Sequence, residues 1–407
     1  MATLAGKAPP LGIDPALVID FDFYDDPLYA SAGGIPEAMV ELRDAAPDAF
    51  WSTALGGYWV IQGFEAIVDA AKRTDLFSSV KMGIPERPED AQMTQSAPLN
   101  YDPPDHAALR SPLNKVFTPS QMYRRVDQIR DQAIELIENV AHLGKADFFE
   151  TVTERLPVLI FIDLMGLDRA DFKTYRTIAT AGISSTDMQE RIDAGRDARR
   201  LVGQCIRERR AEPRDDLITY ITQMEVNGRP VDDELALSYC ILLFFAGLDT
   251  VANAMAFCMR YLAMDQQLQQ RLRDQPEKIP HAMEELLRRH AVAPVMRTIM
   301  KDEKWRGFNL RAGDMALLNY PAANIDERVF EHGDRVDIDR ERINHIAFGA
   351  GVHRCAGRHL ARIEIVVLLE EVLQRMGTFR LDPENEVTMR GGSVLSIGAL
   401  PLVWQAI

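Results

Sequence analysis

A long apolar stretch from Leu235 to Met264 constrains the fold more than any other part of the sequence. It is long enough to cross a membrane as a helix, but Asp249 lies near its centre and Arg260 follows. A charged side chain is rarely tolerated at the centre of a membrane span. We therefore predict a helix over residues 232–264 that is buried inside a large soluble domain.

The chain is long enough to surround such a helix. It has 407 residues, of which 47% are hydrophobic and 26% are charged, and these values are ordinary for a folded globular protein. No linker interrupts the sequence, so we expect one domain spanning residues 1–407. A domain of this size can bury a large core with space for a sizeable cofactor.

Charge and cysteine content exclude several classes of protein. The net charge is −15 and no stretch is rich in Lys and Arg, so nucleic acid is not an expected partner. Cys205, Cys240, Cys258 and Cys355 are widely and irregularly spaced, which argues against a disulfide framework and for a reducing compartment. Residues 1–10 carry one lysine and no apolar core, so they do not form a signal peptide. We expect a cytoplasmic protein that does not bind a membrane.

The periodicity of apolar residues predicts a mainly α fold with a minor β region. An aromatic, β-branched hairpin is expected over residues 50–62, and residues 80–104 form an expected long loop. Short strands are expected at 296–300, 303–311 and 314–318. Besides 232–264, helices are expected at 35–46, 105–116, 119–142, 149–165, 170–181, 188–211, 215–224, 276–290 and 355–376.

The second constraining feature is the short run from Phe348 to Gly357, which contains Cys355. Small residues before the cysteine allow the backbone to turn tightly and approach a flat ligand closely. The expected helix start at Cys355 would lower the pKa of the thiol and favour the thiolate, which is the metal-binding form. Two other interpretations stay open on these grounds: a small buried cysteine, or a zinc site with His353 and His359.

This run resembles the haem-binding signature of the cytochrome P-450 family, Phe-Gly-x-Gly-x-His-x-Cys-x-Gly. The resemblance implies that haem b is the cofactor and that the thiolate of Cys355 binds its iron, an arrangement that favours O–O cleavage. It also implies a triangular prism of helices with a long central helix on the distal side of the haem and small β-sheets. The matching residues are Phe348, Gly349, Gly351, His353, Cys355 and Gly357.

The segment Ala246-Gly247-Leu248-Asp249-Thr250 resembles the oxygen-binding segment of the same family. Glycine weakens a helix interior, so Gly247 suggests close approach by a ligand or a local opening of the helix. A carboxylate among apolar residues is costly unless it has a purpose, although a paired core aspartate is an alternative. The resemblance implies that Ala246 and Gly247 lie at the cofactor and that Asp249 and Thr250 deliver protons.

Four basic residues resemble those that bind the two haem propionates. His106 and Arg110 share one face of an expected helix, and Arg297 and His353 complete the set. An arginine fork suits a carboxylate well. Without the resemblance, an exposed helix charge would be the preferred interpretation of Arg110.

A further match, Glu285 and Arg288 three residues apart in an expected helix, is weak by itself. In the family this pair is buried and is joined by a later arginine, for which Arg340 is in the right place. We interpret these three residues as structural, holding the loop next to the haem.

Several motifs are similar to the camphor-hydroxylase branch, including Phe21–Tyr24, Asn227–Pro230 and Ala399–Trp404. That similarity implies a compact apolar substrate, such as a terpenoid or a norisoprenoid. The chain departs from the branch because residues 92–98 lack an aromatic side chain and Val295 stands where an aspartate is expected. The expected substrate pocket consists of Leu242, Phe245, Ala246, Ala293, Val295 and Val394, with Thr94 as a polar contact.

The resemblance implies an O2-dependent monooxygenase that receives electrons from a 2Fe–2S ferredoxin, which a flavoprotein reductase reduces in turn. Arg342, Arg354, Arg358 and Arg362 crowd the cysteine segment of an otherwise acidic chain, which suits an acidic partner. A peroxygenase and a non-catalytic haem sensor are the alternatives. The acid–alcohol pair Asp249-Thr250 argues against both, because neither needs a proton relay.

Overall fold

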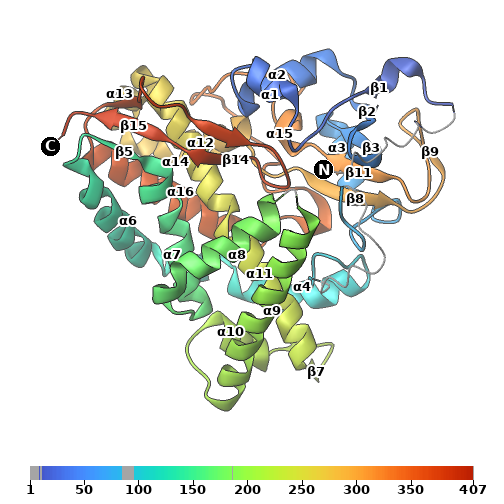
Figure 1. The fold of residues 1–407 in the computed structure, drawn as a ribbon, viewed down its shortest axis with the longest axis horizontal. Coiled ribbons are helices and arrows are strands. Elements are labelled where there is room, and N and C mark those ends of the chain that lie inside the picture. The colour runs from blue at the N-terminus through green and yellow to red at the C-terminus, as the bar shows by residue number, and fades with distance from the viewer. Residues whose placement is uncertain (1–8, 10–11, 85–95, 186, 407) are drawn as a thin grey trace.

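The computed structural model describes residue 9 and residues 12–84, 96–185 and 187–406. The fold is triangular in outline, with helices filling most of it and the largest sheet near one corner (Figure 1). The N-terminal part of the chain lies at this sheet together with strands from residues 295–318. These features confirm the predicted mainly α fold with a minor β region.

The helices follow the apolar periodicity closely in some places and less closely in others. Two predicted helices, 119–142 and 149–165, are each divided, the latter into a π-helix at Phe149–Thr153 and a following α-helix. The α-helices are α1 Pro27–Ser31, α2 Ile35–Ala45, α3 Phe64–Lys72, α4 Asp105–Val116, α5 Pro119–Tyr123, α6 Val126–Ala141, α7 Arg155–Met165, α8 Phe172–Ser184, α9 Met188–Ala211, α10 Leu217–Gln223, α11 Asp233–Leu248, α12 Thr250–Met264, α13 Gln266–Asp274, α14 Ile279–Arg289, α15 Tyr320–Ala323 and α16 Arg358–Arg375.

The central apolar helix is interrupted, so the prediction of one continuous helix over 232–264 is wrong. Helix α11 begins after Asp232, whose Oδ1 accepts a hydrogen bond from the Leu235 backbone at 2.8 Å, and it ends before Asp249. Asp249 has φ −129° and ψ −39°, outside the helical range, and α12 starts at Thr250. The predicted local opening is therefore confirmed. By length and composition the two helices together could span a membrane, but 61% of their most apolar window is buried inside the protein.

The largest sheet joins distant parts of the chain in the order β1-β2-β3-β11-β8-β4. Strands β2 and β3 form the predicted antiparallel hairpin, and β11 pairs parallel with β3 and antiparallel with β8. The remaining strands form small ribbons and a three-stranded sheet. The strands are β1 Val18–Ile19, β2 Ala49–Ser52, β3 Tyr58–Ile61, β4 Phe77–Ser78, β5 Lys145–Asp147, β6 Glu225–Val226, β7 Arg229–Pro230, β8 Val295–Ile299, β9 Glu303–Trp305, β10 Phe308–Leu310, β11 Met315–Leu318, β12 Phe379–Leu381, β13 Thr388–Arg390, β14 Ser396–Ala399 and β15 Pro401–Trp404.

A buried ion-pair network ties α14 to the segment that follows α15. Arg288 donates from Nε and Nη2 to the two carboxylate oxygens of Glu285, both at 2.8 Å, and neither side chain is exposed. Arg340 donates from Nε to Glu285 Oε1 at 3.2 Å. Arg288 also donates to the backbone carbonyls of Asn324 and Gly333 at 2.7 Å. The predicted structural role of this triad is confirmed.

Candidate active site

A cavity of about 370 Å³, the central cavity, is lined by residues of α11, α12, β8 and the loop before α16. Its walls include Ala246 and Thr250, at the end of α11 and the start of α12, and Val295 of β8. Phe348 and Cys355, from the loop that precedes α16, also line it. The two segments that the sequence marked as chemically important therefore meet at one cavity.

Cys355 is the one cysteine, among the described residues, that lines this cavity. Its backbone N–H donates to the Phe348 carbonyl at 2.8 Å, and helix α16 begins at Arg358 rather than at the cysteine. The residue is exposed by surface area. The surrounding protein atoms nevertheless desolvate the thiol and raise its pKa, while the backbone N–H of Gly357 and the guanidinium groups of Arg110 and Arg358 act in the opposite direction. The predicted lowering of this pKa is thus wrong for the protein alone, and a bound metal cation is what would hold the thiolate.

The loop before Cys355 needs its glycines. Gly349 and Gly351 have φ of 78° and 67°, a region that side chains other than glycine rarely adopt. A Cβ atom on Gly351 would lie 2.2 Å from the backbone oxygen of Ala71, at the end of α3. The glycines before Cys355 thus let the loop fit between helix α3 and the cavity.

Arg362 of α16 fixes the same loop from the other side. Its guanidinium lies 4.4 Å from the centre of the Phe348 ring and donates to Glu284 of α14 at 2.5 and 3.0 Å. His345 Nε2 lies 2.8 Å from the same carboxylate. Burial alone would raise the pKa of Glu284, but the hydrogen bonds from His345 and Arg362 hold it at about 2.

The interrupted helix contributes an alcohol to the cavity and a buried carboxyl group next to it in sequence. Thr250 lines the cavity, and its Oγ1 donates to the Ala246 carbonyl at 3.0 Å. Asp249 is 3% exposed, its Oδ1 lies 3.5 Å from Arg176 Nη1, and its Oδ2 has no hydrogen-bond partner among the described residues. Burial raises the pKa of Asp249, although Arg176 opposes the shift. Arg176 also donates to Glu154 Oε1 at 2.6 and 2.9 Å.

Gly247 allows a close approach by a side chain of the protein itself. A Cβ atom at this position would lie 2.4 Å from Cδ2 of Phe161 in α7. Phe161 also lines the cavity. Gly247 lines the cavity too, so it lies where a ligand can approach it, as the sequence suggested. The contact with Phe161 was not indicated by any pattern in the sequence.

Basic residues gather at one end of the cavity, as predicted. Arg110, Arg297 and His353 line it, and the His106 ring lies behind His353, with ring centres 4.3 Å apart. Burial and the nearby charges of Arg297, His106 and Arg110 lower the pKa of His353 to about 3. Burial also lowers the pKa of Arg297, which is 3% exposed and donates to a backbone carbonyl at 2.7 Å. His106 Nε2 is buried and has no hydrogen-bond partner among the described residues. Two guanidinium groups with imidazole rings beside them that can donate hydrogen bonds are typical of a site for carboxylates.

Two residues that the sequence did not single out support this end of the cavity. Ser79 Oγ lies 3.1 Å from His353 Nε2, and its backbone N–H donates to Asp102 Oδ1 at 3.0 Å. Asp102 Oδ1 lies 3.9 Å from the same histidine nitrogen. Asp102 belongs to the acidic, proline-containing run before His106, which was the available signal for it.

Comparison with known proteins identifies the family. The family model "Cytochrome P-450" matches residues 117–397. The chain belongs to the cytochrome P-450 family. Haem b with a cysteine ligand and a monooxygenase activity belong to this family, so both predictions are confirmed at that level.

Three relatives show how much of this P-450 is shared. It is 34% identical over 329 residues, 78% of this chain and 81% of the relative, to the mycinamicin IV hydroxylase/epoxidase of Micromonospora griseorubida. It is 31% identical over 403 residues, 96% of each chain, to the probable cytochrome P-450 127A1 of Sinorhizobium fredii. The crystal structure of CYP101C1, from the camphor-hydroxylase-like branch, matches with a TM-score of 0.88 and 32% identity over 98% of this chain and 100% of that chain.

The residues of this P-450 fit a haem group. The cavity offers one thiol, apolar side chains around it, and the guanidinium groups of Arg110 and Arg297 with the His353 ring for two carboxylates. The unpartnered His106 Nε2 lies behind His353. Among the described residues, no group of three or more His, Cys, Asp or Glu side chains could hold a metal ion, so the zinc site with His353 and His359 is wrong.

The predicted substrate pocket of this P-450 is only partly assembled at the cavity. Leu242, Ala246, Ala293 and Val295 line it. Phe245 and Val394 are not among the described residues that line it. The Phe245 ring lies against Gly182 of α8, and a Cβ atom on Gly182 would be 2.4 Å from Cε1 of this ring. Val394 is buried in the main hydrophobic core. Thr94 lies outside the described residues. Lining residues that the sequence analysis missed include Leu99, Phe161 and Val251.

Proposed function

We propose that this P-450 hydroxylates a compact hydrophobic substrate, a terpenoid or norisoprenoid, with O2 and electrons from a 2Fe–2S ferredoxin that a flavoprotein reductase reduces. The observation that carries the proposal is the central cavity, which Cys355 and Thr250 line together with apolar side chains, next to the helix interruption at Asp249. Haem bound there supplies the activation of O2.

Each part of the cavity has a distinct role in this proposal. Cys355 is the iron ligand, and the glycines at 349, 351 and 357 shape the loop beneath Phe348. Arg110 and Arg297, with His353 and His106 as hydrogen-bonding imidazoles, would bind the two propionates, because guanidinium groups pair well with carboxylates. Ala246 and Gly247 line the same cavity and would contact the haem there.

Asp249 and Thr250 supply protons in this proposal. Oxygen activation by a monooxygenase consumes two protons, which must cross an apolar cavity. The raised pKa of Asp249 lets its carboxyl hold a proton at higher pH than an exposed aspartate does. Thr250 stands between this carboxyl and the cavity, and its hydroxyl can turn from the Ala246 carbonyl to donate into the cavity.

The apolar part of the cavity wall supports an apolar substrate. Its aliphatic and aromatic residues include Leu99, Phe161, Leu242, Val251, Ala293 and Val295. Such walls bind by excluding water and give no fixed hydrogen bond to a polar substrate. We expect a screen of terpenoids to yield compounds that displace water from the cavity and shift the haem absorption, whereas polar compounds of equal size should not.

The outer side of the cysteine loop supports docking of an acidic electron donor. A surface hollow of about 530 Å³ there is lined by Arg110, Lys115 and Val352, and Val352 is 43% exposed. Arg354 is exposed and Arg358 is half-buried. An acidic chain with a local basic surface attracts an acidic ferredoxin and speeds its association. Arg362 contributes less than its sequence position suggested, because its guanidinium is paired with Glu284.

Turnover experiments separate this proposal from its alternatives. Product is expected with O2 and reduced ferredoxin. Product with hydrogen peroxide alone, and none with ferredoxin, would favour a peroxygenase. Tight ligand binding without turnover under either condition would favour a haem sensor. We further propose that residues 1–407 form one catalytic domain that works in the cytoplasm, which cell fractionation and limited proteolysis can test.

A further inference from the structure

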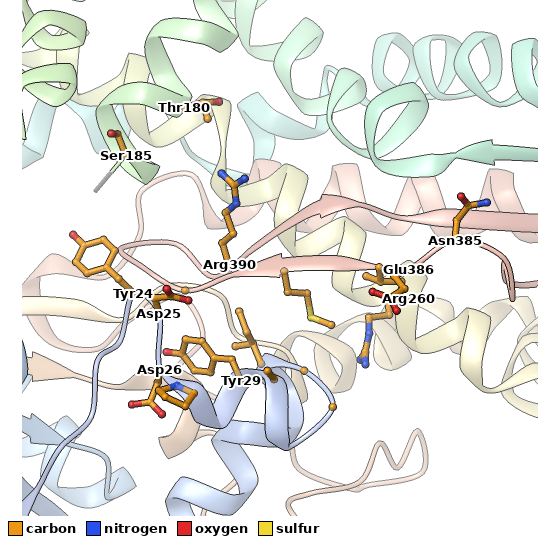
Figure 2. Close-up of a pocket in the computed structure, with 18 of the residues that line it drawn as sticks. Tyr24, Asp25, Asp26, Tyr29, Thr180, Ser185, Arg260, Asn385, Glu386 and Arg390 are labelled. Carbon is orange, nitrogen blue, oxygen red and sulfur yellow. The ribbon is translucent and has the colours of Figure 1, made fainter. Parts of the chain in front are cut away.

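A second and larger cavity, the outer cavity, lies at the surface of this P-450. It measures about 1680 Å³ and is lined by the segment before α2, by α8 and by the β13 hairpin. Figure 2 shows Tyr24, Asp25 and Tyr29 on one wall and Arg390 reaching across the cavity on the side of Thr180. Ile35 and Arg260 also line it. The outer cavity and the central cavity share no lining residue among those described.

A small third cavity lies between the two. It measures about 10 Å³, which is close to the space that one water molecule needs. Ile35 lines both the small cavity and the outer cavity. His290 and Ala291 line both the small cavity and the central cavity. The three cavities therefore form a row, with Ile35 at one junction and His290 at the other.

His290 has polar atoms that the protein does not satisfy. Its side chain is 4% exposed, and neither ring nitrogen has a hydrogen-bond partner among the described residues. The ring lies between Phe257, stacked at 6.3 Å, and Tyr261, at 5.2 Å. A buried polar group without a partner is costly, and a water molecule is the usual remedy. No hydrogen bond to the described residues has to break when this ring turns toward either cavity.

The charges around His290 favour neutral water over protons. Burial and the nearby guanidinium groups of Arg289, Arg260 and Arg288 lower the pKa of His290 well below its usual value, so the ring is neutral. Fixed positive charge beside a narrow passage repels protons and other cations while water passes. At the far end, Glu364 of α16 lines the central cavity, and burial raises its pKa well above the usual range. A protonated carboxyl group there can exchange hydrogen bonds with water.

We propose that His290 binds a water molecule in the small cavity. This water occupies the intermediate binding site on a path for water between the outer cavity and the central cavity. Each monooxygenase turnover forms one water molecule, and each substrate that binds displaces others. The path would carry this water on the side of α12 and α14, while protons arrive through the Asp249 carboxyl group, which Arg176 contacts. The inference depends on a haem-containing cavity but not on the identity of the substrate or of the electron donor.

The first test is a high-resolution crystal structure of the haem-loaded enzyme. We expect an ordered water within hydrogen-bond distance of a His290 ring nitrogen. A ring that is dry, or that bonds to protein atoms only, would overturn the proposal.

The second test measures how fast water in the haem cavity exchanges with bulk water, from water-proton relaxation of the ferric enzyme. His290→Phe should slow this exchange about tenfold, which is the effect of losing one net hydrogen bond at the bottleneck. His290→Gln keeps a donor and an acceptor and should stay close to the wild type. Tyr261→Phe is the matched control, because Tyr261 contacts the same ring but is not among the described residues lining the three cavities.

The outcomes distinguish this inference from the proposed function. Unchanged exchange in His290→Phe, or equal slowing in Tyr261→Phe, would refute the water path even if the enzyme hydroxylates terpenoids. If His290→Phe does not fold, slowed exchange in His290→Gln would likewise count against a water-binding role. A thiolate-type spectrum of the reduced carbon monoxide complex in each variant shows that the haem site is intact.

Discussion

Replacing Glu285 by glutamine removes the charge at the centre of the buried network that joins α14 to residues 324–340. Four donors point at this carboxylate: Nε and Nη2 of Arg288, Nε of Arg340 and the backbone N–H of Asp337. A glutamine oxygen can accept from some of them, but its amide group then faces the others as a donor. The Arg288 charge, which is fully buried, would lose its counter-ion.

The expected cost follows from this geometry. Removing one partner of a buried ion pair costs about 3–5 kcal/mol. Because several hydrogen bonds are lost together, we expect Glu285→Gln to lower the free energy of unfolding by about 4 kcal/mol, a roughly thousandfold change in the ratio of folded to unfolded protein. The network supports the segment leading to the cysteine loop, so haem should also dissociate faster from the variant.

Urea unfolding of the haem-loaded enzyme, followed by circular dichroism, measures this change as a shift of the midpoint at constant slope. Asp193→Asn is a matched control, since Asp193 pairs with Arg196 at the same helical spacing but with side chains 55% and 73% exposed. Its cost should be below about 0.5 kcal/mol. A cost below about 1 kcal/mol for Glu285→Gln would refute the reasoning that burial makes this charge indispensable.

The other predictions concern the site and its surroundings. Cys355→His should abolish the thiolate-type spectrum of the reduced carbon monoxide complex, and its retention would remove Cys355 as the ligand. Thr250→Ala should still consume reducing equivalents but release more hydrogen peroxide and less product, so full coupling would contradict a role in proton delivery. Replacing both Arg354 and Arg358 by glutamate should slow the reduction of the enzyme by ferredoxin without changing its affinity for substrate. Added salt should slow the reduction of the wild type in the same way. A reduction rate that neither change alters would place the docking site elsewhere. The ion pair of Glu284 should stabilise the fold fully above about pH 4.5 and lose this effect as the pH falls toward about 2. The difference in free energy of unfolding between wild type and Glu284→Gln, measured by urea titration, should therefore shrink over that range.

The sequence predicted those helices and strands whose capping residues and apolar faces lie within the element itself or directly beside it. Helix α9 was expected at 188–211 and occurs there, because its apolar face is regular and Asp187 accepts hydrogen bonds from Gln189 N and Glu190 N at its start. Helix α13 was missed because glutamine and arginine dominate it and only Leu268 and Leu272 mark its buried face. The break at Asp249 was suggested by Gly247, but periodicity alone continued the helix through it.

The site could be predicted where a compact motif carries it, and not where distant segments meet. Cys355, Asp249 and Thr250 belong to short runs that are readable in the sequence. Contacts such as Ser79 with His353, 274 residues apart, or Phe161 with Gly247 arise only when the chain is folded. The same limitation explains Phe245, whose position on α11 was right but whose ring turns toward Gly182.

The pairing of β3 with β11 has a consequence for how the chain matures on the ribosome. Strand β11 is synthesised roughly 250 residues after β3, and β8, its other neighbour, emerges only shortly before it. At about 5–20 residues per second, the β2–β3 hairpin waits about 12 to 50 seconds for its partner. During this interval the hairpin exposes an unpaired edge and the side chains of Trp51 and Trp59, which are later buried. Slower chain growth therefore prolongs the time in which the nascent N-terminal region needs protection from aggregation.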